Sequence, residues 1–358
     1  MNKRNLLIVC GVCLMLLGIT ASAKTIAYWR FETGPVNTQV QHSAGDGVFS
    51  PDVPDSSGNG NELAVWNVNK YAYRSAVAYS QVPQTGAINN FSVKNTDGGP
   101  AMWTDTNDPI NTWEPAQWTI EATFKIEQGG WKTIIGRDSQ GMATKGNNTD
   151  GNLSALYFQA TDNPSVGLAI KYVDKDGYWH DAVSTANAYV GFNFGSVPDG
   201  LLAPWYSMAA TCDGRYLRLY LYNWSQPQNG YVKIAETDMT VTNPGSTNTA
   251  MSRGTGDGGD WNAGDFSVGR GLYGGGHGDR AYGYIDEVRF SDVALPVSQF
   301  LASPGFVQPV SPAQDDYLNS TAAISYTWSA DIPEEVVFDH YTLYVADAVE
   351  DLAPTAPT

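Results

Sequence analysis

The chain of 358 residues carries 37 acidic and 20 basic residues, a net charge of -17, with 11 Trp and 20 Tyr. Such a negative field disfavours nucleic acid and anionic membranes as partners, whereas a cation or a neutral carbohydrate meets no such repulsion. Two of the three cysteines, Cys10 and Cys13, stand in the first 13 residues and leave with the leader predicted below, so no intramolecular disulfide is expected. We expect the third, Cys212, to be a small buried hydrophobic residue.

The first residues have the pattern of a secretory signal peptide. Two basic residues precede an apolar run over residues 6–19, and "ASAK" supplies the small residues at which a signal peptidase cuts. The run is shorter than the roughly 18 to 20 residues that span a membrane. The sequence therefore predicts a signal peptide at 1–23, no membrane insertion, and a mature protein that is secreted or displayed at the cell surface.

Strand patterns dominate the next 280 residues. "WTIEATFKI", residues 118–126, alternates strictly between an apolar face and a polar face. Asp213 and Gly214 separate two further strand patterns and favour a hairpin turn. No segment shows an amphipathic helix longer than a turn or two. Residues 24–302 are therefore predicted to form an all-β, two-sheet antiparallel jelly-roll sandwich. Its other expected strands are "TIAYWRF", "KTIIGR", "SALYFQA", "GLAIKYV", "WYSMAAT", "RYLRLYLYN", "GYVKIAE", "FSVGRG" and "YGYIDEVRF".

Two long polar insertions, residues 71–115 and 243–264, are expected as loops that are either functional or simply mobile. Residues 303–358 begin with a Pro-rich linker, and short strands are predicted at 322–328 and 340–345. This segment resembles the opening of a fibronectin-type or immunoglobulin-like module, which needs ~90 to 100 residues. A partial module is expected, and other domains of a longer chain are possible partners.

Several stretches, in their order and spacing, resemble the laminin-G-like, concanavalin A-like lectin superfamily, particularly its bacterial secreted type. They are "IAYWRFE", "DSSGNGNEL", "WTIEATFKI", "TIIGRDS", "AATCDGRYLRLYL", "FSVGRG" and "YGYIDEVRFSDVAL". The resemblance implies a sandwich of two curved antiparallel sheets, often with one structural calcium. Such domains occur in lectins, in adhesins and as accessory modules of polysaccharide-degrading enzymes, so the resemblance implies no single activity.

The strand "YIDEVRF" draws attention to one carboxylate. Alternation places Asp286 on the face of Val288 and Phe290, toward the core, and leaves Glu287 and Arg289 as a solvated pair. A buried carboxylate must find an arginine, hydrogen bonds or a metal.

The resemblance implies a calcium ion between the first strand, the loop after it and an Asp of the last strand. In this sequence its ligands are expected to be Glu32 (through its carbonyl), Asp55, Gly58 and Asn61 of "DSSGNGN", and Asp286. Calcium prefers oxygen ligands, which a Gly-rich and Asn-rich turn supplies. The interval between Glu32 and Asp55 is longer than is usual in the family, so the part of Glu32 stays open. The alternative is that hydrogen bonds hold Asp286 and the loop is only a turn.

No catalytic constellation is recognised, and the protein is expected not to be an enzyme. The E-x-D-x-E strand of laminarinase-type glycosidases is missing, and Glu121 and Lys125 are expected to be solvated on an ordinary sheet face. "LYFQA" is faintly similar to the YxKA strand of alginate-lyase jelly rolls, but Gln159 replaces the Lys and the partner motifs are missing, so this resemblance is discarded. The four His residues have no metal-ligand spacing.

Aromatic residues in polar loops favour carbohydrate binding, because sugar rings stack on exposed aromatic side chains. The predicted ligand-binding residues are Trp261, Tyr273, Trp103 and Trp113. The expected function is a secreted lectin-like module that binds carbohydrate or a surface glycoconjugate and holds a structural calcium. The alternatives are a structural or adhesive cell-surface protein and a polysaccharide-degrading enzyme with an unrecognised site.

Overall fold

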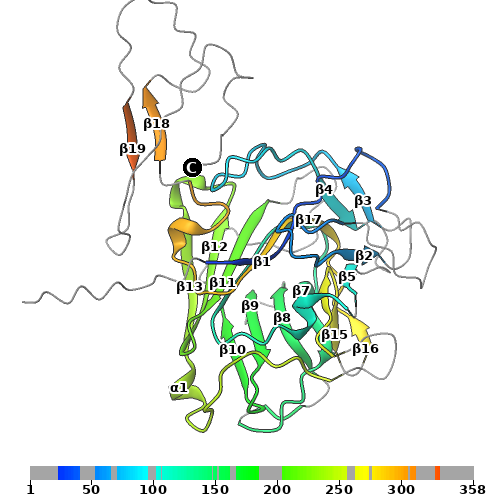
Figure 1. The fold of residues 1–358 in the computed structure, drawn as a ribbon, viewed down its shortest axis with the longest axis vertical. Coiled ribbons are helices and arrows are strands. Elements are labelled where there is room, and N and C mark those ends of the chain that lie inside the picture. Colours follow the sequence, from blue (N-terminus) through cyan, green and yellow to red (C-terminus); the bar gives the residue numbers. More distant parts are fainter. Residues whose placement is uncertain are drawn as a thin grey trace, which may run out of the picture.

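A computed structural model describes residues 23–40, 53–65, 71–95, 102–105, 107–146, 148–150, 153–161, 167–184, 204–255, 263–273, 276–304, 307–311 and 327–330. Within these ranges the chain is almost entirely β-structure (Figure 1). The one α-helix there, α1 (Met239–Thr242), has four residues, and none of the described helices is long and apolar enough to cross a membrane. The other helical elements among the described residues are the 3-10 turns η1 (Pro109–Thr112), η3 (Pro227–Asn229) and η4 (Val297–Gln299).

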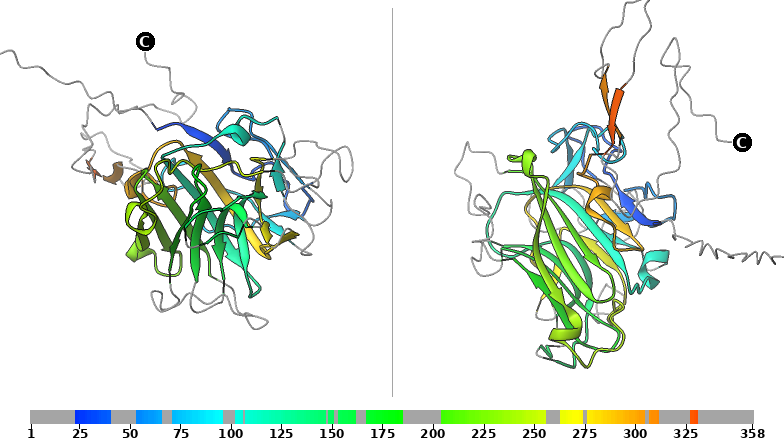
Figure 2. Two further views of the ribbon diagram at one scale, coloured as in Figure 1. Left: turned by 90° about the horizontal axis from the view of Figure 1, so that it is seen from below. Right: turned by 90° about the vertical axis from the view of Figure 1, so that its left-hand side faces the viewer.

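Two antiparallel sheets form the sandwich that the alternation predicts. Sheet A runs in the order β13-β12-β11-β6-β17-β4-β3, and β1 also pairs with β17; sheet B runs in the order β10-β9-β8-β7-β14-β5-β2 (Figures 1 and 2). The strands of sheet A are β1 (Thr25–Trp29), β3 (Tyr71–Arg74), β4 (Ser92–Asn95), β6 (Trp118–Ile126), β11 (Tyr206–Cys212), β12 (Tyr216–Asn223), β13 (Tyr231–Asp238) and β17 (Gly283–Ser291). Those of sheet B are β2 (Leu63–Val65), β5 (Met102–Thr104), β7 (Lys132–Gln140), β8 (Ser154–Ala160), β9 (Leu168–Val173), β10 (Trp179–Val183) and β14 (Phe266–Val268).

Two small antiparallel pairs lie outside the large sheets: β15 (Gly271–Tyr273) with β16 (Gly276–Gly278), and β18 (Val307–Ser311) with β19 (Thr327–Ala330). The strand predicted at 322–328 overlaps β19 at Thr327 and Trp328. The strand predicted at 340–345 and most of the leader at 1–23 lie outside the described residues.

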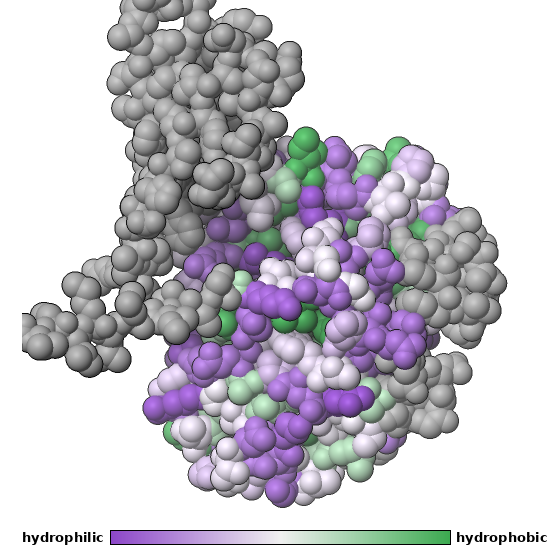
Figure 3. All heavy atoms as spheres, in the orientation of Figure 1, coloured by the Kyte–Doolittle hydropathy of each residue, from purple (hydrophilic) through white to green (hydrophobic). Residues whose placement is uncertain are grey.

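The core lies between the sheets and follows the predicted alternation. In β6 the five residues of the apolar face, Trp118, Ile120, Ala122, Phe124 and Ile126, all belong to the central apolar cluster. Asp213 and Gly214 form the β11–β12 hairpin turn, where Gly214 has φ of +92°. Cys212 is buried, as expected. Seen from the side of Figure 1, the surface is mostly polar and its apolar residues form small separate patches (Figure 3).

The predicted loop at 71–115 is wrong in part, because it contains β3, β4 and β5, which extend both sheets at one end. These strands have only three or four residues each, too few for alternation to stand out from their polar surroundings. In the predicted loop at 243–264, the described residues form no strand.

The outer face of sheet A is covered rather than solvated, which corrects the expectation for Glu121 and Lys125. Both are buried, and Glu121 forms an ion pair with Arg289, whose Nε donates to Glu121 Oε2 at 2.7 Å. The backbone N–H of Leu301 donates to Glu121 Oε1 at 2.7 Å. Residues 293–303 and 76–91 lie over this face and are called the sheet A cover: Leu295 and Phe300 pack with Ala209, and the Tyr79 hydroxyl lies 3.1 Å from Thr123 Oγ1.

A β-bulge in β17 reverses the predicted faces of its first half. The ladder with β6 shifts between Asp286 and Arg289, and Glu287 adopts a left-handed φ of +49°. Ile285, Val288 and Phe290 therefore share the core, whereas Asp286 pairs with Thr123 on the outer face of sheet A. Asp286 is buried beneath the sheet A cover. The prediction that it faces the core is therefore wrong. The prediction that Glu287 and Arg289 form a solvated pair is also wrong, since both are buried.

Candidate functional site

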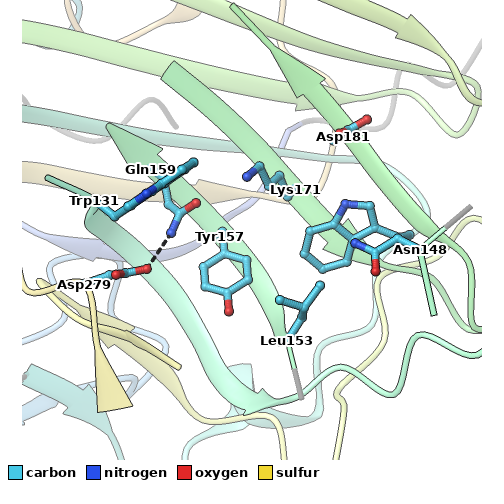
Figure 4. A pocket seen from close by; sticks show the side chains of 9 residues that line it. Trp131, Asn148, Leu153, Tyr157, Gln159, Lys171, Asp181 and Asp279 are labelled. Atoms are coloured by element: carbon cyan, nitrogen blue, oxygen red, sulfur yellow. Dashed lines mark hydrogen bonds between the residues drawn. The ribbon is translucent and has the colours of Figure 1, made fainter. Parts of the chain in front are cut away.

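The candidate site is a hollow of about 380 Å³ on the outer face of sheet B, over β8, β9 and β10 (Figure 4). A volume of this size is typical of a small-molecule or glycan pocket. It combines three aromatic rings with amide, ammonium and carboxylate groups. Its lining residues are Trp131, Asn148, Leu153, Tyr157, Gln159, Lys171, Trp179, Asp181 and Asp279.

Alternation along three neighbouring strands brings the central residues together. The inward positions of β8 and β9, such as Leu156 and Ile170, pack in the core, so the residues between them point outward. In register, Tyr157 pairs with Lys171, and Lys171 pairs with Asp181. One row across the sheet thus places the buried Tyr157 phenol, the Lys171 ammonium and the exposed Asp181 carboxylate side by side.

Aromatic side chains form the apolar part of the site. Trp131 stands in the turn between β6 and β7 and is 36% exposed, and the Lys171 ammonium lies 5.0 Å from its ring centroid. The rings of Tyr157 and Trp179 meet edge to face, with centroids 6.0 Å apart at an interplanar angle of 62°. These contacts hold the aromatic surfaces in place before a ligand arrives.

Hydrogen bonds fix the polar groups at the base of the hollow. The Tyr157 hydroxyl donates to the Leu272 carbonyl and accepts from the backbone N–H of Ser154 at 3.0 Å. Gln159 Nε2 donates to Asp279 Oδ2 and to Thr133 Oγ1, each at 3.1 Å (Figure 4). Such second contacts lock side chains in a binding geometry.

The Gly-rich segment of the sequence supplies one wall. β15 packs against β7, and Asp279 follows β16 with a left-handed φ of +50°. The Thr133 N–H donates to the Asp279 carbonyl at 2.7 Å, which ties this wall to the edge of β7. The wall therefore hangs on β7 while its carboxylate faces the hollow.

Burial disfavours the charged forms of Lys171 and Asp279. Burial lowers the pKa of Lys171, and the nearby Asp181 and Asp279 carboxylates act in the opposite sense. Burial likewise raises the pKa of Asp279, against the opposing influence of Lys132, Lys171 and the Gln159 hydrogen bond. Partly desolvated groups of this kind form stronger hydrogen bonds with a ligand than the same groups in water.

None of the four predicted ligand-binding residues is among the residues that line this hollow. Trp261 is outside the described residues, and Tyr273 lies in β15, where only its backbone is described. Trp103 is half-buried in β5, between β2 and β14. Trp113 packs on the core, with centroids 6.0 Å from Phe290 and 6.4 Å from Phe266. Trp131, Tyr157 and Trp179 were not predicted from the sequence. The signal that could have found Tyr157 and Lys171 is the alternation of "SALYFQA" and "GLAIKYV", which places both on the face opposite the core.

Trp113 therefore tests whether aromatic content or position marks the site. Trp113→Ala is expected to lower the free energy of unfolding by about 2 to 4 kcal/mol, since it removes a partly buried ring from Phe266 and Phe290. Glycan affinity, measured by calorimetry below the melting temperature, is expected to stay within about twofold. A large loss of affinity in a folded Trp113→Ala protein would contradict the placement of the site.

The loop "DSSGNGN" fastens β1. Asp55 Oδ1 accepts from the N–H groups of Tyr28 and Ser57 at 2.9 Å each, and Asp55 Oδ2 accepts from the Ser57 hydroxyl at 2.8 Å and the Asn61 N–H at 3.1 Å. Asn61 Oδ1 accepts from the Ile110 N–H at 2.8 Å. Gly58 has φ of +76°, which lets the loop curl. N–H and O–H donors thus occupy these oxygens, and this geometry needs no cation.

The other two predicted calcium ligands, Glu32 and Asp286, form hydrogen bonds with residues 89–91. The Glu32 carboxylate accepts hydrogen bonds from the N–H groups of Asn90 and Phe91 at 2.9 Å each. It thereby holds the end of the 76–91 segment of the sheet A cover. Asp286 Oδ2 accepts from Asn89 Nδ2 at 2.9 Å. Among the described residues, no group of three or more His, Cys, Asp or Glu is arranged to hold a metal.

No family model matches the sequence, and no curated protein matches it. Solved structures with some similarity include domain 4 of AbnA, an extracellular GH43 arabinanase from Geobacillus stearothermophilus, in complex with arabinotriose. It is 17% identical over 77% of this chain and 96% of that chain, with a TM-score of 0.42. The CBM40 of Ruminococcus gnavus IT-sialidase, bound to α2,6 sialyllactose, is 15% identical over 60% and 96%, with a TM-score of 0.40. At these scores neither bears on what this chain binds.

Proposed function

We propose that this chain is an exported, non-catalytic carbohydrate-binding protein whose site is the hollow on the outer face of sheet B. The observation that carries this proposal is the grouping of the exposed Trp131 ring and the half-buried Trp179 ring around hydrogen-bonding side chains in one hollow, with Tyr157 buried at its base. A sugar ring has apolar C–H faces and a rim of hydroxyls, and therefore needs both kinds of surface. The leader pattern at 1–23 supports export.

The polar groups support binding rather than catalysis. The Tyr157 hydroxyl and the Gln159 amide nitrogen are both used in hydrogen bonds that hold the site together. A glycosidase of the usual kind needs one carboxylic acid and one carboxylate flanking the scissile bond. Here Asp279 is tied to Gln159, and Asp181 stands exposed at the far end of the row.

The test is a glycan array followed by calorimetry on the mature chain, residues 24–358. We expect saturable binding to at least one polysaccharide or oligosaccharide, with no release of reducing sugar on prolonged incubation. Product release that a single Asp181→Asn or Asp279→Asn substitution abolishes would overturn the non-catalytic assignment. Failure to bind any glycan would overturn the proposal itself.

We further propose a structural calcium ion beside Asp286. Asp286 Oδ1 and Asn89 Oδ1 are both buried without a hydrogen-bond partner, and Asn89 Nδ2 joins the two side chains. Two such oxygens fit a hard cation, which would take further ligands from backbone carbonyls or water. The Asp55 loop does not fit this role, because N–H and O–H donors meet its oxygens.

Metal removal tests this second proposal. Chelation with EDTA is expected to lower the melting temperature by roughly 5 to 10 °C, since a ligand that binds only the folded state stabilises it. Asp286→Asn is expected to melt at the same temperature with and without EDTA. If wild-type melting is indifferent to EDTA and to added calcium, Asp286 is instead held in its protonated form, in line with the raised pKa that burial gives it.

A further inference from the structure

We infer that the hollow on sheet B selects neutral glycans and discriminates against acidic sugars such as uronates and sialic acids. This inference rests on the proposed carbohydrate-binding function and names the class of its ligand. It follows from the charges that line the hollow, from their register on the sheet, and from the Trp131 ring and the two carboxylates that already interact with the Lys171 ammonium.

Negative charge prevails among the described residues that line the hollow. Lys171 is their one cation, and Asp181 and Asp279 are their two carboxylates. Asp181 is the cross-strand partner of Lys171 in the β9–β10 ladder, so one carboxylate stands beside the ammonium on the same face. The carboxylate of an acidic sugar would meet two lining carboxylates and one lining ammonium, with the Lys132 ammonium acting on Asp279 from outside the lining residues, on a protein with a net charge of -17.

The cation is also poorly placed to capture an anion. The Lys171 ammonium lies 5.0 Å from the Trp131 ring centroid, an attraction that competes with a bound anion. Burial lowers its pKa, so its charge is stabilised mainly by the two carboxylates nearby. Proteins that recognise carboxylates usually present the bidentate fork of an arginine. A single ammonium balanced by two aspartates offers no such fork.

Neutral hydroxyls fit the same groups well. Each hydroxyl both donates and accepts a hydrogen bond, and the Lys171–Asp181 pair offers a donor beside an acceptor. Asp279 adds a second carboxylate, held in place by Gln159. A hydroxyl donates to either carboxylate, whereas a sugar carboxylate would face them with lone pairs only. The arrangement therefore matches vicinal hydroxyls above an aromatic platform.

The experiment compares matched neutral and acidic polysaccharides by affinity electrophoresis and calorimetry. The neutral probes are xylan, galactan and mixed-linkage β-glucan, and the acidic probes are polygalacturonate and alginate, each at low and high salt. We expect binding to at least one neutral probe that changes little with salt, and affinities for both acidic probes at least about tenfold weaker at low salt.

A charge variant separates this inference from the proposed function. Asp181→Asn with Asp279→Asn removes two negative charges while retaining an oxygen for the Gln159 amide, and is expected to narrow the difference between acidic and neutral probes. Tighter binding of an acidic probe by the wild-type protein would overturn the neutral-ligand inference and leave carbohydrate binding intact. Binding of neither class would overturn both. An unchanged preference in the variant would also overturn the inference, because charge would not be its source.

Discussion

Trp131→Ala is expected to weaken glycan binding at least about tenfold, which corresponds to about 1.4 kcal/mol or more. Trp131 has 36% of its surface exposed at the edge of the hollow, and it is the most exposed of the three aromatic residues that line it. Its removal also releases the Lys171 ammonium from the ring. Calorimetric titration with the best glycan from the array measures the effect.

Two controls make this result specific. Trp131→Phe keeps a flat aromatic ring and is expected to restore most of the affinity, since stacking rather than the indole N–H makes the contact. The melting temperature of Trp131→Ala is expected to stay within about 2 °C of wild type, because an exposed ring contributes little to the core. An affinity loss equal for Ala and Phe would show that ring stacking is not the basis of binding.

Glu121→Ala is expected to destabilise the fold by about 3 to 5 kcal/mol, the largest effect on stability that we predict. It leaves Arg289 as an unpaired charge whose side chain is only 11% exposed, and it removes the acceptor of the Leu301 N–H. The Arg289 guanidinium and the Leu301 N–H lie within or beneath the sheet A cover, where water solvates them poorly. The expected fall in melting temperature is roughly 8 to 15 °C, measured by calorimetry at neutral pH.

The double variant Glu121→Leu with Arg289→Met is the matched control. It removes both charges together and fills similar volume, so it is expected to be more stable than Glu121→Ala by at least about 1 kcal/mol. Equal destabilisation in the two variants would show that the loss comes from packing or from the Leu301 N–H rather than from a stranded charge.

Strand identity was predictable from the sequence wherever alternation ran for seven residues or more, as in β6, β8 and β11. It failed for β2, β3, β4 and β5, whose three or four residues carry too little pattern, and for the five-residue β10. It also gave the wrong face for Asp286, because one extra residue at the Glu287 bulge inverts every position before it. A single sequence carries no reliable signal for a bulge, so alternation alone could not have predicted the change of face.

The predicted solvent face of β6 was wrong for a different reason. Alternation shows that Glu121 and Lys125 lie opposite the core, but it cannot show that residues 293–303 return over Glu121 or that the Tyr284 ring and Glu127 lie against Lys125. The candidate site met the same obstacle. Trp131, Tyr157, Lys171 and Asp279 are far apart in the chain, and only the register of β7, β8 and β9 and the Gly-rich wall bring them together.

The β15–β16 hairpin that carries the Asp279 wall has a consequence for how new specificities could arise. Its two strands pair only with each other, outside both large sheets. Sequence change within it therefore alters one side of the hollow without breaking a ladder of the sandwich. Side-chain changes at residues 276–279 keep the backbone hydrogen bond from Thr133 N–H to the Asp279 carbonyl, and are a direct route to engineered variants with altered sugar preference.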